Sequence, residues 1–372
     1  MTMMYMILGA LLPAIAGMIA AQAPILSPEV HPDRSVTFRF RDLGAKKVEL
    51  SLEGQDAQAM SKGADGVWTY QTPPLAPDIY GYNFTADGET RLDIHNPAFK
   101  PNLIWLSNMV LVPGSPPEAW EVQPVPHGEL HHVFYRSGVI GDERDYFVYT
   151  PPGYKSNSGQ RLPVLYLLHG YSDTANGWSE VGKAHVIMDN LIAQGKAKPM
   201  VVVMTLGYGV PDFASPVRSG FRDPGIVSRN YLLYKEALLT EVIPSVDRDF
   251  RVSKNRNDRA IAGLSMGGAE SLFVGLNSVD TFAYVGAFSS GGLSDNFEKD
   301  FPKIGRPEVW KKLNLLWISC GVDDGLITFN RSLVQWLQGK GVPLEVHETP
   351  GRHAWMVWRR NLIGFTQLLF RK

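Results

Sequence analysis

Hydrophobic and polar residues alternate in short segments between residues 25 and 111. Four such segments, separated by turn residues, lie at 35–40, 47–52, 66–70 and 80–84. A period of two is typical of antiparallel strands with one buried face, and Asp87-Gly88 is a hairpin signal. Because no helical pattern interrupts these segments, the sequence predicts an all-β, immunoglobulin-like sandwich over residues 24–112.

After a proline-rich stretch at 113–126, which is typical of a linker, the pattern changes. Uniformly apolar runs now lie at 164–168, 200–204, 260–262, 284–288 and 315–320. Segments with helical periodicity alternate with them, at 181–194, 231–246, 269–276, 330–337 and 354–370. Strands that are apolar on both faces and alternate with helices belong to a mainly parallel sheet covered by helices. Residues 127–372 are therefore predicted to form an α/β domain.

The first 28 residues contain no charged side chain, and residues 6–21 are almost entirely apolar. Small residues follow, and Ala21-Gln22-Ala23 fits a signal-peptidase site, so residues 1–23 are predicted to be a signal peptide. An uncleaved anchor is the alternative, because the apolar run approaches the roughly 18 residues at which a helix begins to span a membrane. Both interpretations predict export, to the periplasm or the medium.

Composition and charge exclude several classes of protein. The chain has 372 residues, 44% of them hydrophobic and 20% charged, which suits a globular protein with a buried core and excludes a disordered or collagen-like one. A net charge of −1 with no concentrated basic region makes nucleic acid an unexpected partner. Cys320 is the single cysteine and lies in an apolar run, so it is predicted to be a buried apolar residue. No metal or cofactor is expected.

The sequence Gly-Leu-Ser-Met-Gly at 263–267 fits the G-x-S-x-G nucleophile elbow. A strand pattern at 259–262 enters the motif and a helical pattern leaves it. In this strand–turn–helix setting a tight turn lifts the serine above the sheet. An ordinary glycine-rich turn between a strand and a helix is the competing interpretation, but it does not require a serine at the centre of the turn. Ser265 is therefore the candidate nucleophile.

A serine hydroxyl needs a base to take its proton, and the base needs a carboxylate to orient it. In this fold the serine, the acid and the histidine follow one another along the chain, which leaves two histidines after Ser265. His347 lies within a predicted strand, whereas His353 lies in the loop between that strand and the last helix. His353 is therefore the predicted base. Asp323 and Asp324 both follow the apolar run ending at Cys320, and their spacing does not distinguish which one is the acid.

A glycine turn at Gly170 follows the apolar run 164–168, where the second donor of an oxyanion hole is expected. The backbone N–H groups of Tyr171 and Met266 are predicted to hold the negative oxygen of the tetrahedral intermediate. His169 precedes the serine in the chain and is predicted to pack beneath this loop.

These motifs resemble the esterase D group of α/β-hydrolases, and within it carbohydrate esterase family one, the feruloyl and acetyl-xylan esterases. The matching segments, which cover about residue 130 to the C-terminus, lie at 167–170 with Trp178, at 261–268, at 320–324, and at 351–355 with Trp358. The resemblance implies that Asp324 is the acid of the triad. It also implies hydrolysis through an acyl-enzyme, without a metal or cofactor.

The first domain resembles the early-set β-sandwiches grouped as carbohydrate-binding module family 48. The resemblance is carried by segments 66–68, 80–84, 87–88 and 93–97. It implies that Trp68, Tyr80 and Phe84 stack on sugar rings. The same three residues alternate as core residues do, so burial in the sandwich is the competing interpretation.

Together these observations predict an exported serine esterase that removes feruloyl or acetyl groups from plant polysaccharides such as xylan. Tyr171, Trp178, Trp355 and Trp358 lie in or next to the catalytic motifs, so a hydroxycinnamoyl ester is expected to be preferred over acetyl. Trp178 and Trp355 are expected to contact the phenolic ring, whereas Trp358 is expected to lie on the inward side of the last helix, in the core. Loops 207–225 and 291–307 are expected to line the acyl pocket. Two alternatives remain: a hydrolase of siderophore trilactones related to enterochelin esterase, and a carbohydrate-binding protein with an inactive hydrolase domain.

Overall fold

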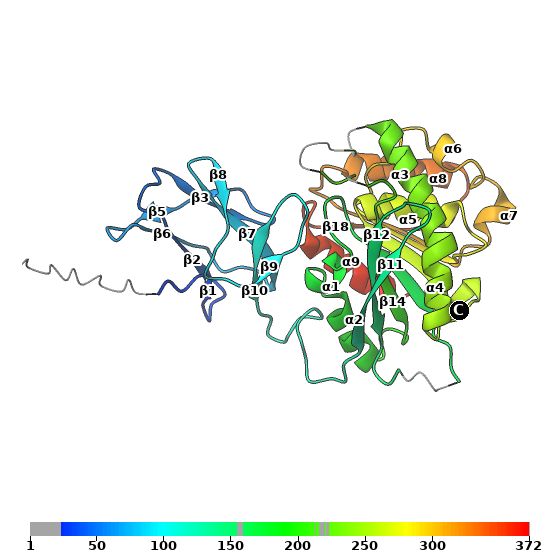
Figure 1. Ribbon diagram of the computed structural model, residues 1–372, viewed down its shortest axis with the longest axis horizontal. Helices are drawn as coiled ribbons and strands as arrows, with labels where there is room; N and C mark the ends of the chain where they lie inside the picture. The colour runs from blue at the N-terminus through cyan, green and yellow to red at the C-terminus, as the bar shows by residue number, and fades with distance from the viewer. Residues whose placement is uncertain (1–23, 155–158, 212, 216–219, 221–222, 372) are drawn as a thin grey trace, which may run out of the picture.

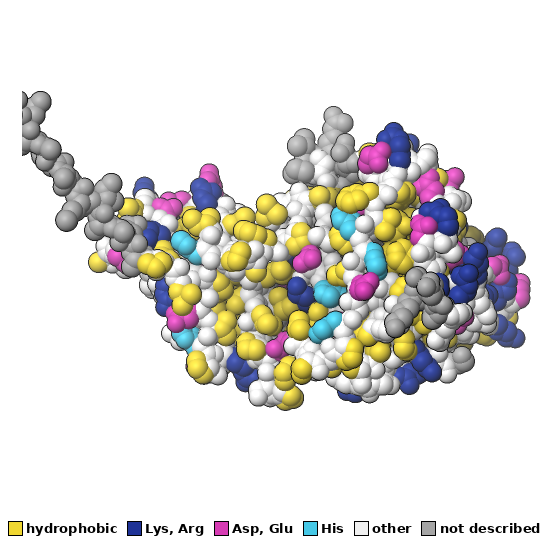
Figure 2. Space-filling model, turned by 60° about the horizontal axis from the view of Figure 1, so that its bottom comes forward, with side chains coloured by type: hydrophobic (Ala, Val, Ile, Leu, Met, Phe, Trp, Pro, Cys, Tyr) yellow, Lys and Arg dark blue, Asp and Glu magenta, His cyan; other side chains and the backbone are white. Residues whose placement is uncertain are grey.

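The computed structural model describes residues 24–154, 159–211, 213–215, 220 and 223–371. They form a smaller β-sandwich lobe and a larger α/β lobe that lie side by side (Figure 1). The space-filling view shows one continuous surface across their junction (Figure 2). The predicted signal peptide or anchor at 1–23 lies outside the described residues. In the part of the chain that is described, no helix combines the length and the apolar character needed to cross a membrane.

The sandwich consists of two antiparallel sheets, ordered β1-β2-β6-β5 and β4-β3-β7-β10-β9, with β8 beside β7. Its strands are β1 (Glu29–Val30), β2 (Val36–Arg41), β3 (Val48–Leu52), β4 (Gln58–Ala59), β5 (Ser61–Lys62), β6 (Val67–Gln71), β7 (Asp78–Ala86), β8 (Glu89–Arg91), β9 (Phe99–Lys100) and β10 (Ser107–Val112). In β3 the buried residues Val48, Leu50 and Leu52 alternate with partly exposed ones, as the period of two predicts. The prediction of an all-β first lobe is thus confirmed.

The aromatic residues of the sandwich lie inside it. Trp68, Tyr80 and Phe84 are all buried in one cluster between the two sheets. Burial is therefore the correct interpretation of these residues, and none of the three offers its face to a sugar from solution.

The α/β lobe is built on an eight-stranded sheet with the order β11-β12-β14-β13-β15-β16-β17-β18. Its strands are β11 (Glu129–Arg136), β12 (Glu143–Thr150), β13 (Val164–Leu168), β14 (Val201–Thr205), β15 (Arg259–Leu264), β16 (Tyr284–Phe288), β17 (Leu315–Gly321) and β18 (Glu345–Thr349). The first two strands are antiparallel and the remaining six are parallel to one another. Each of the five apolar runs in the sequence overlaps one strand of the parallel part, which confirms the α/β prediction.

Helices cover both faces of this sheet (Figure 1). They are α1 (Gly177–Glu180), α2 (Ala184–Ala193), α3 (Pro224–Ala237), α4 (Ile243–Asp249), α5 (Met266–Leu276), α6 (Phe297–Asp300), α7 (Pro307–Trp310), α8 (Ile327–Gly339) and α9 (Trp355–Thr366). A short π-helical turn at Leu238–Val242 joins α3 to α4, and a 3-10 turn at Arg256–Asp258 precedes β15. Side chains of α1, α2 and α9 pack on one face of the sheet, and those of α3, α4, α5 and α8 pack on the other. Apolar strands need this double cover, because both of their faces exclude water.

The two lobes are joined by polar contacts between the sandwich and the region around α9, which contacts β7 (Figure 1). Arg359 of α9 is paired with Asp78 of β7, and the backbone N–H of Trp355 donates to Glu53 at 3.0 Å. The loop between β9 and β10 also reaches the larger lobe, where the N–H of Leu103 donates to the carbonyl of Ser172 at 2.7 Å. This last contact places a sandwich loop beside the predicted oxyanion loop.

Candidate active site

Ser265 occupies the turn between β15 and α5, with a backbone φ of 52° and ψ of −117°. A positive φ is strained for a residue with a side chain and is kept only where the surroundings enforce it. Here the glycines on either side allow the tight turn. A Cβ atom on Gly263 would lie 2.4 Å from the carbonyl oxygen of Gly267, and one on Gly267 would lie 2.3 Å from that of His169. The motif therefore has the geometry of a nucleophile elbow.

The structure brings Ser265, His353 and Asp324 together from three separate loops. His353 Nε2 lies 3.0 Å from Ser265 Oγ, and His353 Nδ1 lies 2.8 Å from Asp324 Oδ2. With Nδ1 donating to the carboxylate, Nε2 is free to accept the proton of the serine hydroxyl. The three residues thus form the hydrogen-bonded chain of a serine hydrolase.

Burial separates the two candidate carboxylates. The side chain of Asp324 is inaccessible to solvent and accepts hydrogen bonds from His353 and from the N–H of Leu326, whereas Asp323 is exposed. Burial alone would raise the pKa of Asp324, but the hydrogen bonds and the charge interaction with His353 outweigh it and hold the pKa below its usual value. Asp324 is therefore ionised at neutral pH and orients His353, as the family resemblance implies.

The predicted oxyanion loop lies against the nucleophile. A Cβ atom on Gly170 would lie 2.6 Å from Leu264 Cδ1, so glycine lets this loop pack against the end of β15, next to Ser265. Tyr171 follows it on the wall of the cavity that contains Ser265, and Met266 is the first residue of α5. These positions suit the proposed role of their backbone N–H groups.

His169 packs beneath this loop, as predicted. Its Nε2 accepts from the N–H of Gly207 at 2.9 Å, which leaves Nδ1 as the donor to the carbonyl of Gly170 at 2.7 Å. Burial lowers its pKa to about 4, so the ring is neutral at physiological pH. His169 thereby connects the loop after β14 to the oxyanion loop.

Ser265 and His353 line a cavity of about 810 Å³, whose walls come from both lobes. The larger lobe contributes the loops that follow its parallel strands, including Ser215, Gly291 and Gly292 from the two loops predicted to line the acyl pocket. The sandwich contributes Lys100, Asn102, Ile104 and Trp105. These four residues were not predicted from the sequence. The one sign in the local sequence that this loop has a special role is that residues 103–106 are apolar but do not follow the period of two of a strand.

The tryptophans near the catalytic motifs have different roles. Trp355 lies in the wall of the cavity, although only 1% of its surface is exposed, and Trp358 lies edge-on to the His353 ring at 4.8 Å. The prediction that Trp178 contacts the substrate is wrong. Its side chain is completely buried, its Nε1 donates to the carbonyl of Leu168 at 2.8 Å, and its ring packs edge-on against Trp355 at 5.1 Å. Trp178 therefore supports the wall from within the core.

Asp173 contributes a carboxyl group to the cavity wall. Its Oδ1 accepts a hydrogen bond of 2.9 Å from the side-chain amide of Asn102, which crosses from the sandwich. Burial raises the pKa of Asp173 to about 6, although Lys100 and Asn102 act in the opposite direction. Close to neutral pH this group therefore changes charge at the boundary between the lobes.

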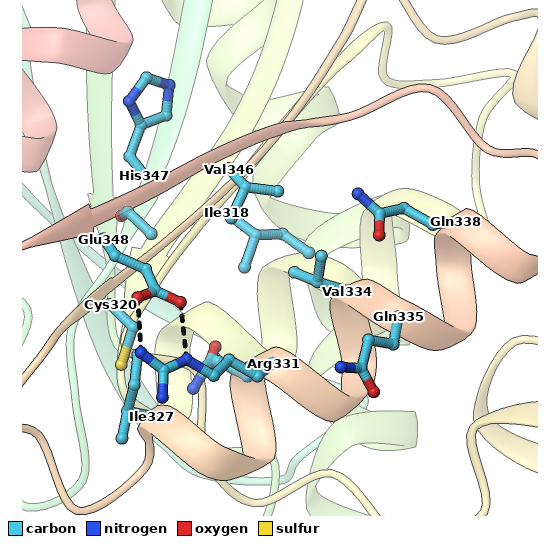
Figure 3. A pocket seen from close by; sticks show the side chains of 12 residues that line it. Ile318, Cys320, Ile327, Arg331, Val334, Gln335, Gln338, Val346, His347 and Glu348 are labelled. Atoms are coloured by element: carbon cyan, nitrogen blue, oxygen red, sulfur yellow. Dashed lines mark hydrogen bonds and ion pairs between the residues drawn. The ribbon is translucent and has the colours of Figure 1, made fainter.

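A smaller cavity of about 240 Å³ lies between α8 and the strands β17 and β18, and contains none of the triad residues (Figure 3). Ile318, Val334 and Val346 line it, and the ion pair between Arg331 and Glu348 crosses its edge. Cys320 also lies here; burial raises the pKa of its thiol to about 12, so it remains protonated. It is the buried apolar residue that its sequence context predicted.

The elbow, the triad and the sheet define the class of protein as an α/β-hydrolase with a serine nucleophile. Residues 137–368, more than half of the chain, match the family model described as putative esterase. The chain therefore belongs to this esterase family.

Individual relatives agree with this class. An endo-1,4-β-xylanase/feruloyl esterase of Xylanibacter ruminicola is 31% identical over 352 residues, which cover 92% of this chain and 46% of that protein. This chain thus spans about half the length of that relative. A ferulic acid esterase of Anaeromyces mucronatus, solved in complex with ferulic acid, is 25% identical with a TM-score of 0.57, and covers 67% of this chain and 93% of its own.

A third relative extends over both lobes. The enterochelin esterase of Shigella flexneri has a TM-score of 0.69 and covers 91% of this chain and 92% of its own, at 18% sequence identity. This likeness shows that the two-lobed fold is shared.

Proposed function

We propose that the protein is a serine esterase that hydrolyses hydroxycinnamoyl or acetyl esters on plant polysaccharides such as xylan. The observation that carries the proposal is the complete Ser265–His353–Asp324 chain, of which Ser265 and His353 line a large cavity. Its volume of about 810 Å³ lies within the range of sites that enclose a small organic group.

The geometry supports hydrolysis in two steps. Ser265 Oγ attacks the ester carbonyl carbon while His353 Nε2 takes its proton, and Asp324 stabilises the resulting imidazolium. The negative oxygen of the tetrahedral intermediate accepts hydrogen bonds from the N–H groups of Tyr171 and Met266. His353 then gives the proton to the departing sugar oxygen, which leaves an acyl group on Ser265. Water, activated by His353, releases the acid by the same steps.

Within this class we favour a hydroxycinnamoyl group over acetyl. Four aromatic side chains line the cavity, Trp105, Tyr171, Trp355 and Trp358, and flat rings pack well against a phenolic ring. The xylanase/feruloyl esterase relative and the neighbour that binds ferulic acid support this preference. An acetyl group would fill little of the cavity.

A siderophore trilactone is the second candidate substrate, because the enterochelin esterase shares both lobes. Iron-loaded catechol trilactones are anionic and require a cationic site. Among the described residues that line the cavity, Lys100 is the single lysine or arginine, and it lies 3.7 Å from Glu53. Charge therefore favours a neutral ester.

The deciding experiment compares kcat/KM on methyl ferulate, feruloylated and acetylated arabinoxylan oligosaccharides and a catechol trilactone, with Ser265→Ala as the control. We expect the feruloylated oligosaccharide to be the best substrate. Preference for acetyl would contradict the choice of acyl group, and activity on the trilactone alone would contradict the polysaccharide assignment. No Ser265-dependent hydrolysis of any of the four, together with oligosaccharide binding, would indicate the carbohydrate-binding alternative.

We further propose that the protein is exported and that the segment 1–23 directs this step, which places the enzyme where its polymer substrate is. Fractionation and N-terminal sequencing of the protein from expressing cells test this. A mature chain that begins at Pro24 indicates cleavage, and an intact chain in the membrane fraction indicates an anchor. Retention in the cytoplasm would contradict export.

A further inference from the structure

Glu270 is a buried carboxyl group one helical turn after Met266, the first residue of α5. Residues four positions apart lie on the same face of a helix, and helical side chains point back towards its N-terminus. A third residue confirms that the two side chains lie close together. A Cβ atom on Gly207 would lie 2.8 Å from Glu270 Oε2 and 3.5 Å from Met266 Cε. The carboxyl group of Glu270 therefore lies behind the oxyanion hole, where the mechanism described above does not use it.

Asn230 connects this carboxyl group to the loop after β14. It belongs to α3, which packs against α5. Asn230 Nδ2 donates to Glu270 Oε1 at 3.0 Å. Its Oδ1 accepts from the backbone N–H groups of Gly209 at 2.8 Å and Val210 at 3.1 Å, in the segment 206–210, which we call the β14 loop. Both side chains are fully buried, so loss of either one would leave polar groups unsatisfied away from water.

The donors and acceptors of this pair show which form of Glu270 is needed. Because backbone N–H groups can only donate, they fix the orientation of the Asn230 amide, and Glu270 Oε1 has to accept. Burial raises the pKa of Glu270 well above its usual value, although Asn230 and the charge of Arg144 act in the opposite direction. Glu270 Oε2 has no hydrogen-bond partner among the residues that the structure describes. The neutral acid suits this site, since a buried carboxylate with an unpartnered oxygen would be costly.

The β14 loop supports the oxyanion loop at two points. The N–H of Gly207 donates to His169 Nε2 at 2.9 Å, and Nδ1 of the same ring donates to the carbonyl of Gly170 at 2.7 Å. The hydroxyl of Tyr208 donates to the carbonyl of Asp173 at 2.7 Å. The β14 loop thus connects α5, which provides one predicted oxyanion donor, to the loop that provides the other.

We propose that Glu270 and Asn230 are a positioning pair that fixes the distance between the two N–H donors of the oxyanion hole. One donor, Met266, shares α5 with Glu270, and the other, Tyr171, lies on the loop that the β14 loop supports. This inference rests on the oxyanion hole of the proposed function, but not on the identity of the acyl group. Because an oxyanion hole binds the transition state more tightly than the substrate, a displaced donor lowers kcat and leaves KM nearly unchanged.

Hydrolysis of 4-nitrophenyl acetate tests the pair with an ester that carries neither a sugar nor a hydroxycinnamoyl group. Glu270→Leu is expected to lower kcat at least about tenfold while KM stays within about twofold. Glu270→Gln should keep kcat within about twofold, because an amide has the shape of the neutral acid and its oxygen accepts from Asn230. Tyr234→Phe is the matched control. It removes a buried hydrogen bond of α3, of 2.6 Å, which goes to Thr205 of β14 and not to the β14 loop.

Gly209→Ala tests the same connection from the side of the loop, and decides the matter if Glu270→Leu does not fold. A Cβ atom there would lie 2.5 Å from the backbone nitrogen of Tyr234, and closer still to the carbonyl oxygen of Asn230, so the β14 loop must move away from α3. We expect the same loss of kcat. Wild-type kcat in Gly209→Ala, or equal losses in Glu270→Gln and Glu270→Leu or in Tyr234→Phe and Glu270→Leu, would overturn the inference.

Failure of the proposed function gives a different result. A wild type that hydrolyses no ester would refute the proposed function itself. The rate of labelling by a fluorophosphonate would then still compare the variants, because the phosphoryl oxygen of this probe occupies the same hole. Slower labelling of Glu270→Leu than of Glu270→Gln would support the positioning pair, and equal rates would overturn it.

Discussion

Arg359 of α9 and Asp78 of β7 form an ion pair in which neither side chain is accessible to solvent, with 2.5 Å between Nη2 and Oδ1. The guanidinium also donates to the carbonyl oxygens of Ile79, in the sandwich, and Val181, in the larger lobe. It is therefore held by oxygen atoms from both lobes. The pair therefore helps to hold together the two lobes whose residues line the catalytic cavity, among them Lys100 and Trp105 from the sandwich.

Asp78→Ala is expected to destabilise the protein strongly, because it leaves the charge of Arg359 buried without its counter-ion. Loss of one partner of a buried pair costs about 3–5 kcal/mol, whereas replacing both partners with apolar residues costs much less. Denaturant titration should give the lowest free energy of unfolding for Asp78→Ala, a higher one for the double variant Asp78→Leu/Arg359→Met, and the highest for the wild type. Arg360→Ala is the control: Arg360 lies 2.7 Å from the same carboxylate but is 44% exposed, so about 1 kcal/mol or less is expected. Equal losses in Asp78→Ala and Arg360→Ala would contradict this account.

Ser265→Ala and His353→Ala are each expected to lower kcat by about 10⁴-fold or more with the fold intact, because members of a triad act as a unit. Ester hydrolysis gives the rates, and circular dichroism checks the fold. A fluorophosphonate probe should label the wild type and fail to label Ser265→Ala. Substantial activity in folded Ser265→Ala would show that another nucleophile acts.

Asp324→Asn is expected to lower kcat by about 10⁴-fold, because the amide no longer stabilises the imidazolium form of His353. Asp323→Asn should leave kcat within about threefold, since Asp323 is exposed and the carboxylate bonded to His353 is that of Asp324. Both variants replace a carboxylate with an amide, at neighbouring positions, so each is the control for the other. The opposite order would show that the loop presents the other carboxylate to His353 during turnover.

The triad was largely readable from the sequence because each member follows a strand of the parallel sheet, and the ends of parallel strands meet at one edge. The choice of Asp324 over Asp323 depended on the family resemblance, and burial now gives its physical reason. Trp178 shows that a position close to the catalytic motifs in the sequence does not place a side chain in the site. It follows the oxyanion loop, yet its ring faces the core.

The contribution of the sandwich to the cavity could not be read from local patterns. It depends on how the lobes dock, and the docking is fixed by contacts such as that between Arg359 and Asp78, which lie 281 positions apart. The residues next to Arg359 and Asp78 in the sequence do not indicate that the two form a pair. The position of Trp105 beside Tyr171 is a consequence of this docking, so it appears only in three dimensions.

The buried carboxyl group of Asp173 predicts a pH dependence of stability. Its pKa is about 6 in the folded protein, raised by burial, against about 3.9 for an unfolded aspartate. Since the folded state holds the proton more tightly, the contribution of this group to stability is complete below about pH 4 and is lost as the pH rises through about 6. Two pKa units correspond to about 3 kcal/mol.

Asp173→Asn removes this titration and keeps a side-chain oxygen that accepts the hydrogen bond from Asn102. The free energy of unfolding of the wild type, taken relative to that of Asp173→Asn, is therefore expected to fall by about 2–3 kcal/mol between pH 4 and pH 7. Urea titrations of both proteins at half-unit steps of pH measure this difference directly. If the free energies of unfolding of the two proteins differed by the same amount at every pH, burial would not hold Asp173 in a protonated form. Water would then reach Asp173 at the junction of the lobes.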